Sequence, residues 1–132
     1  MRRFTIISAL IAAVAMLAAI APVASASGSG TTRTISLHGS VSFPSATGKA
    51  VYKVKGGERE LQIEVEHIRA LAGKHVNVFV NGNKLASPTV NSLGNVNVNR
   101  NTERGQFVPT IRTGSTVRVR TLGGTLIASG TF

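Results

Sequence analysis

Apolar side chains alternate with mostly polar ones between positions 60 and 82, and this alternation constrains the fold more than any other feature. Leucine, isoleucine or valine occupies every second position from 61 to 65, and valine does so again from 76 to 80. Successive side chains of a strand point to opposite faces, so each segment predicts a strand with one buried and one solvent-facing side. Asn81-Gly82 predicts a tight hairpin, because both residues accept a positive φ. The stretch favours an antiparallel β-sandwich and indicates no chemical reaction.

Turn residues divide the remaining sequence into further short strands. Gly56-Gly57 and Gly123-Gly124 predict two more hairpins. The predicted strands cover residues 34–43, 49–55, 60–67, 75–80, 84–86, 95–99, 116–122 and 125–131. The sequence thus predicts an all-β fold, an antiparallel Ig-like β-sandwich of about seven to eight short strands.

The same alternation predicts which side chains form the core. The expected interior residues are Leu61, Ile63, Val65, Val76, Val78, Val80, Val96, Val98, Val117 and Val119. The expected outward-facing residues are Gln62, Glu64, Asn77, Asn97, Arg118 and Arg120. Within the irregular stretch 100–115, we expect Phe107, Val108 and Ile111 to close one end of the sandwich. The chain has no Cys, so its core must stabilise it without disulfides.

The first 26 residues have the features of a secretory signal peptide. Arg2 and Arg3 form a positively charged start, residues 4–20 are apolar, and Ala24-Ser25-Ala26 supplies the small residues of a cleavage site. The alternative is an uncleaved anchor over 4–23. We expect a signal peptide over 1–26, a flexible lead-in over 27–33 and one sandwich domain over 34–132. The protein should then be secreted or extracytoplasmic, with no membrane span after cleavage.

The predicted mature chain is strongly basic. Thirteen Lys and Arg residues face five Glu and no Asp after position 26, which gives a net charge of about +8. This charge favours anionic polysaccharide or cell-envelope phosphates as partners. The alternative is that the charge only keeps a small exported domain soluble. Five Phe, one Tyr and no Trp disfavour nucleic acid, because few rings are available for base stacking.

Five arginines form the candidate ligand-binding set. Arg118 and Arg120 share the outward face of the predicted strand 116–122, and the other three lie in the stretch before it. If this strand lies in one sheet with the asparagine-rich strand 95–99, the guanidinium groups make one polar strip that binds carboxylate or phosphate bidentately. An ordinary solvated face is the alternative. The candidate residues are Arg100, Arg104, Arg112, Arg118 and Arg120.

Catalytic and metal chemistry have few candidates. Glu64 and Glu66 share one strand face, but that face is also expected to be solvated. His67 and His75 bracket residues 68–74 and approach each other only if the flanking strands pair, and two imidazoles are too few for a structural zinc site. We therefore expect no enzymatic activity, no catalytic residue, no metal site and no cofactor.

Five segments also carry a family resemblance: LQIEVEHI, LAGKHVNVFVNG, ERGQFVPTI, GSTVRVR and GTLIASGTF. Their order resembles small secreted bacterial β-sandwich modules of uncharacterised function and, more distantly, the CHRD (chordin-type) domains. The resemblance covers nearly all of 34–132 and implies an extracellular accessory module. We therefore predict an exported, non-enzymatic module that binds anionic polymers. The alternative is a self-associating structural or adhesin-like surface subunit, which the asparagine ladder and the β-branched residues suggest.

Overall fold

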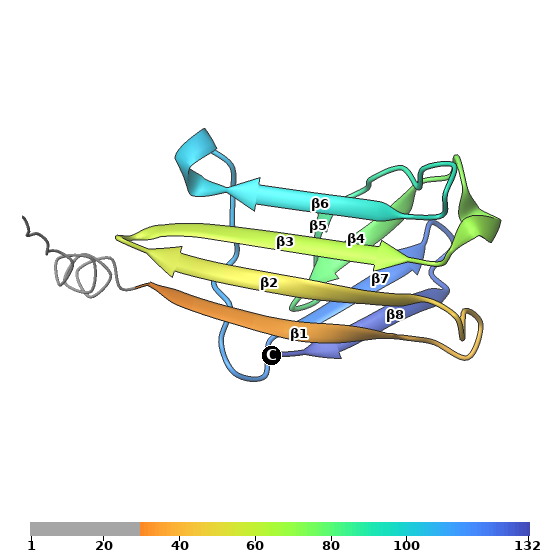
Figure 1. Ribbon diagram of the computed structural model, residues 1–132, viewed down its shortest axis with the longest axis horizontal. Coiled ribbons are helices and arrows are strands. Elements are labelled where there is room, and N and C mark those ends of the chain that lie inside the picture. The colour runs from red at the N-terminus through yellow and green to blue at the C-terminus, as the bar shows by residue number, and fades with distance from the viewer. Residues whose placement is uncertain (1–29) are drawn as a thin grey trace, which may run out of the picture. The chain divides into compact units, whose positions relative to one another are not determined.

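Eight antiparallel strands make up the computed structural model, which describes residues 30–132 (Figure 1). They are β1 (Thr31–Gly39), β2 (Thr47–Lys55), β3 (Glu58–Glu66), β4 (Val76–Val80), β5 (Asn83–Ala86), β6 (Val96–Asn101), β7 (Thr116–Thr121) and β8 (Leu126–Thr131). Two short 3-10 turns, η3 (Arg69–Leu71) and η4 (Thr102–Arg104), lie between them. The predicted all-β antiparallel sandwich is confirmed. In the part of the chain described, no helix is long and apolar enough to cross a membrane.

The start of the domain differs slightly from the prediction. The predicted signal peptide lies outside the described residues. β1 begins at Thr31, so residues 31–33 belong to the strand and not to a flexible lead-in. The cause is pairing with β2, in which Thr31 lies opposite Val54 and Arg33 opposite Tyr52.

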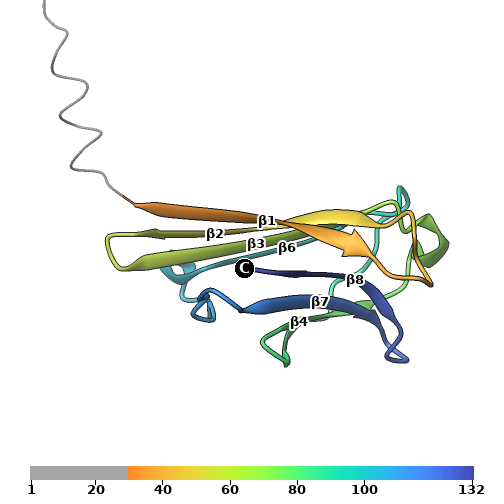
Figure 2. The same ribbon diagram turned by 90° about the horizontal axis from the view of Figure 1, so that it is seen from below.

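The strands form one sheet that folds over into two layers, as Figure 2 shows. The strand order is β5-β4-β7-β8-β1-β2-β3-β6, with β5 and β6 at the two edges. The first layer contains β1, β2, β3 and β6, and the second contains β4, β5, β7 and β8. The layers join where the last residues of β1 pair with β8, with His38 opposite Ser129 and Gly39 opposite Ala128. This junction is short, which lets the sheet bend.

The core lies between the two layers and contains the residues that the alternation predicts. All ten expected interior residues are buried, and none of the six expected outward-facing residues is buried. Leu37, Ile68 and Ile127 add large side chains that are almost completely covered. The register of the strand faces is therefore confirmed.

The predicted Gly56-Gly57 and Asn81-Gly82 hairpins are confirmed. They connect β2 to β3 and β4 to β5, and all four turn residues have positive φ angles. This is the backbone conformation that such two-residue turns require.

The long segment between η4 and β7 covers the inner face of the first layer at one end. β1, β2 and β3 are nine residues long, whereas no strand of the second layer exceeds six. Figure 1 shows the segment running across the three long strands. Val108 and Ile111 of this segment are buried, as predicted. Phe107 is 72% exposed, so that part of the prediction is wrong. Consecutive side chains of an extended segment point to opposite sides, and Val108 takes the interior position.

Candidate functional site

The single strip of five arginines that the sequence predicts does not form. The prediction assumed that the strand 95–99 and the strand that carries Arg118 and Arg120 lie in one sheet; they do, but a shared sheet does not make them neighbours. The two corresponding strands, β6 and β7, are not neighbours: β6 pairs with β3 at an edge of the first layer, whereas β7 lies between β4 and β8 in the second. The outward faces of the two layers point in opposite directions. The arginines are therefore distributed over different surfaces.

Arg100, Arg104 and Arg112 each lie in a separate environment. Arg100 belongs to β6 and not to the following loop; it lies opposite the buried Leu61, and its Nη2 donates to the carbonyl of Leu85 in β5 at 3.2 Å. Arg104 lies in η4 and donates to Asn99 Oδ1 at 3.3 Å. Arg112 is exposed on the loop before β7. The Arg100 guanidinium thus links the two edge strands.

Arg118 and Arg120 belong to a basic surface on the second layer. In one row across three strands, Phe79 of β4 lies between Lys84 of β5 and Arg118 of β7. Arg120 lies one row further, opposite Asn77. We call these five residues the basic face. Lys84 and Arg118 are exposed, and Phe79 and Arg120 are half-buried.

The basic face carries no negative charge. None of the strands β4, β5, β7 and β8 contains an acidic residue. The arginine side chains are held by neutral groups: Arg118 Nη1 donates to Thr116 Oγ1 at 3.5 Å, and Arg120 Nη1 donates to the carbonyl of Gly124 at 3.1 Å. No carboxylate on these strands competes with an anionic ligand for the guanidinium groups.

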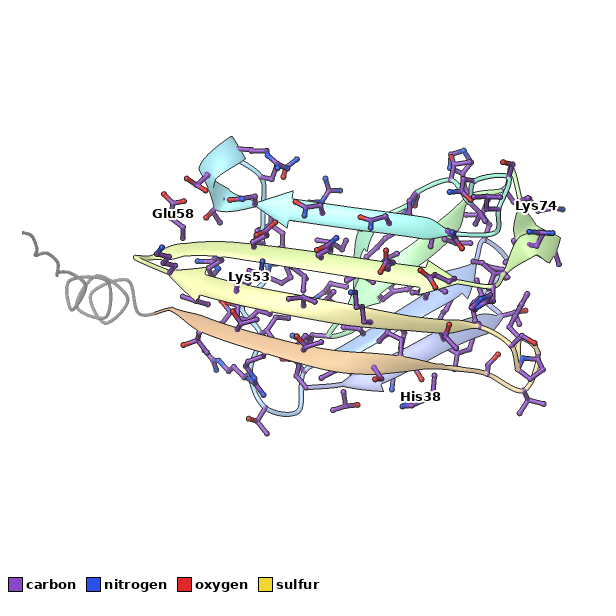
Figure 3. The ribbon with its side chains drawn as sticks, in the orientation of Figure 1. His38, Lys53, Glu58 and Lys74 are labelled. Atoms are coloured by element: carbon purple, nitrogen blue, oxygen red, sulfur yellow. The ribbon has the colours of Figure 1, made fainter. Side chains whose placement is uncertain are left out.

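The outward face of the first layer carries charges of both signs. Three lysines of β2 lie opposite three glutamates of β3, in the pairs Lys49–Glu64, Lys53–Glu60 and Lys55–Glu58. The Lys49 Nζ and Glu64 Oε1 atoms are 4.0 Å apart. Lys53 and Glu58 lie near the β2–β3 hairpin in Figure 3. A groove of about 520 Å³ at this end is lined by cations and carboxylates together. Charges of opposite sign therefore compensate one another on this face.

The two candidate histidines do not flank a pair of hydrogen-bonded strands. Their flanking strands β3 and β4 lie in different layers, so the hairpin that would join His67 and His75 is absent from residues 30–132. The Nδ1 atom of His67 lies 3.1 Å from Thr47 Oγ1, and that of His75 lies 3.1 Å from the carbonyl oxygen of Ser87. In the described residues, no three His, Cys, Asp or Glu side chains are grouped so that they could hold a metal ion. The carboxylates of Glu64 and Glu66 lie on the outward face of β3, beside β2.

No known protein family, curated protein or solved structure matches this chain. The resemblance to secreted bacterial sandwich modules and CHRD domains stays a prediction. The surface chemistry of the chain itself is therefore the guide to its function.

Two residues of the basic face were missed by sequence reasoning. Phe79 occupies an outward position of an alternating strand, and an aromatic residue there is the signal that could have identified it. Lys84 could have been placed beside it, because a two-residue hairpin at Asn81-Gly82 determines which residues lie opposite each other. Arg118 could not have been added to the row, since the β4–β7 pairing joins residues far apart in the sequence.

Proposed function

We propose that this chain is an exported, non-enzymatic β-sandwich module that binds anionic polymers through its basic face. The observation that carries the proposal is the segregation of charge between the two layers. Four of the five Glu residues lie on β3 in the first layer, whereas the strands of the second layer carry Lys84, Arg118 and Arg120 and no acid. A surface of one sign attracts a polyanion to one side of the molecule. The signal-peptide features and the resemblance to secreted modules support export.

The geometry of the row suits a polymer with repeated negative groups. Neighbouring strands are about 4.8 Å apart, so the backbone positions of Lys84 and Arg118 are about 10 Å apart, with the Phe79 ring between them. Carboxylate, sulfate or phosphate groups on successive units would contact the two cations. The apolar face of a sugar ring would pack on Phe79. Acidic polysaccharide uses all three contacts, whereas envelope phosphate uses only the charges.

Two triple variants that have the same net charge as each other test the proposal. The first, Lys84→Gln with Arg118→Gln and Arg120→Gln, removes three charges from the basic face. The control, Lys49→Gln with Lys53→Gln and Lys55→Gln, removes three charges from the first layer. Affinity for immobilised heparin and for polyphosphate is measured as a function of salt concentration. The basic-face variant should lose about tenfold or more in affinity. In a plot of log affinity against log salt concentration, its slope should become less steep by about one unit for each lost contact. The control should lose much less.

Equal losses in the two variants would contradict the proposal, because binding would then follow net charge alone. A Phe79→Ala variant distinguishes the polymer classes. It should weaken binding of heparin and leave binding of polyphosphate unchanged if sugar rings pack on Phe79.

Self-association is the second candidate function, and the free edge of β6 favours it. Asn101 directs its N–H to Gln106 Oε1 at 2.9 Å and accepts from the Gln106 N–H at 3.3 Å, so both its backbone groups point away from β3. Alternation along a strand then directs the backbone groups of Asn97 and Asn99 toward the same free edge. Two copies of this edge would pair as antiparallel strands. Sedimentation velocity should detect dimers that Asn97→Lys abolishes, and a protein that stays monomeric at high concentration excludes this function.

A further inference from the structure

A groove lies between the β4–β5 hairpin and the segment that follows η4. Its volume is about 370 Å³. Val80 and Leu85 line it from the hairpin, and Phe107 and Pro109 line it from the other segment. We call this cavity the end groove. Small-molecule sites usually have volumes of about 300–1,000 Å³, mostly apolar walls and a few polar groups.

The apolar wall includes an exposed aromatic ring. Phe107 is 72% exposed, although the adjacent Val108 is almost completely buried. Among residues 30–132, Phe107 is the one aromatic residue in the set of large, exposed apolar side chains. Its ring and the pyrrolidine ring of Pro109 both line the groove, and a flat apolar group can pack against them. The wall therefore fits a small ring better than a polar group.

The polar part of the groove is positively charged. Arg59 and Lys84 line it, and no carboxylate does. Arg59 Nη2 donates to the Val108 carbonyl at 2.8 Å, which holds the guanidinium beneath the loop. Its Nε is buried and has no hydrogen-bond partner in the described residues. No carboxylate of the described residues forms a salt bridge with Arg59, so its positive charge favours an anionic ligand in the groove.

We propose that the end groove binds a small aromatic carboxylate. The ring packs between Phe107 and Leu85, and the carboxylate faces Arg59 and Lys84. The chemical class of the ligand follows from the two parts of the groove. The apolar wall favours a flat apolar ring, and the basic part favours a single negative charge. This site goes beyond the proposed polymer binding and shares with the basic face only Lys84.

Fluorescence anisotropy of 2-naphthoate tests the site directly. The chain contains no Trp, so protein emission does not overlap that of the naphthyl ring. The neutral 2-naphthamide has nearly the same shape and should bind about tenfold more weakly, because it lacks the charge that faces Arg59 and Lys84. Phe107→Ala should weaken naphthoate binding by about tenfold, and Lys84→Gln by about threefold to tenfold. Amide shifts of Leu85 and Phe107 on titration should locate the ligand.

Two control variants separate this site from other surfaces. Leu93→Ala removes another apolar side chain, 62% exposed and outside the groove, and should leave naphthoate binding unchanged. Arg118→Gln should weaken heparin binding only, whereas Phe107→Ala should weaken naphthoate binding only. The proposal is overturned if naphthoate does not bind, if naphthamide binds equally well, or if Leu93→Ala and Phe107→Ala have equal effects.

Discussion

Arginine residues have two different roles in this chain, and the strand face on which each lies decides between them. Arg33, Arg59 and Arg100 lie on the inward side of the first layer, at the end that extends past the second. Each donates to another segment: to Thr113 Oγ1 at 3.3 Å, to the Val108 carbonyl at 2.8 Å and to the Leu85 carbonyl at 3.2 Å, respectively. The Arg33 guanidinium also lies 5.6 Å from the centre of the Phe132 ring. These three residues link different segments of the fold, and Arg59 also lines the end groove, whereas Arg118 faces solvent.

The structural role of Arg100 is tested by removing its donor and keeping its aliphatic stem. Arg100→Met should lower the free energy of unfolding by about 1–2 kcal/mol, because the half-buried charged hydrogen bond to Leu85 is lost. Arg112→Met, at an exposed loop position, should change it by less than about 0.5 kcal/mol. Urea unfolding of both variants measures the difference. Similar values for the two would show that the Arg100 hydrogen bond contributes no stability.

The alternation of buried and exposed residues makes a second prediction at the scale of single residues. Ile63→Ala should cost about 2–4 kcal/mol and Val78→Ala somewhat less, because both side chains are almost completely buried. Glu64→Ala and Asn77→Ala remove the adjacent outward side chains and should cost less than about 0.5 kcal/mol each. Denaturant unfolding of the four variants measures this. A loss at Glu64 as large as that at Ile63 would contradict the observed burial.

At the scale of the elements, the decisive contact is the one between β8 and β1, where the sheet bends. Gly130 of β8 lies so close to β1 that an added Cβ would be 2.6 Å from the Ser36 carbonyl oxygen and 2.8 Å from Leu37 Cδ2. Only glycine allows this approach without displacing backbone. The junction thus depends on the absence of a side chain.

Gly130→Ala should therefore destabilise the protein by about 1–3 kcal/mol, the range typical of overpacking. Gly123→Ala is a matched control in the β7–β8 turn, because the nearest atom to its added Cβ would be Thr121 Oγ1 at 3.8 Å. It should change stability by less than about 1 kcal/mol in either direction. Thermal and denaturant unfolding measure both variants. Equal stability of the two would mean that the junction between the layers accommodates a methyl group.

At the scale of the whole domain, one core connects layers that differ in surface charge. The buried residues of both layers form a single cluster, in which Leu61 and Val65 of the first layer belong with Val78 and Val119 of the second. The outer surfaces are independent of this packing, so one layer can carry paired charges and the other only cations. The proposed polymer binding uses the second surface and leaves the core unchanged.

A shared core predicts cooperative unfolding. The slowest amides of β2 and β3 should exchange hydrogen with the same free energy as those of β4 and β7, because neither layer keeps its buried face covered without the other. The amides of β5, a four-residue edge strand, should exchange faster. Native-state hydrogen exchange measures this strand by strand. A much lower free energy for the whole second layer would show that it unfolds separately.

The sequence by itself determined the faces of the strands and the positions of the hairpins. The burial of Ile63 and Val78 followed from a period of two, and the turn at Asn81-Gly82 followed from the ability of both residues to adopt positive φ angles. These are local properties, because they depend only on residue type and on the geometry of an extended chain.

The tertiary structure alone decided which strands are neighbours and therefore which side chains share a surface. The pairings of β3 with β6, β4 with β7 and β1 with β8 join distant parts of the sequence. They separate Arg100 from Arg118 and place Phe79 between two cations. Period-two alternation makes every strand of this chain similar to the others, so it does not select a partner. That selection depends on how all the buried faces pack together in three dimensions.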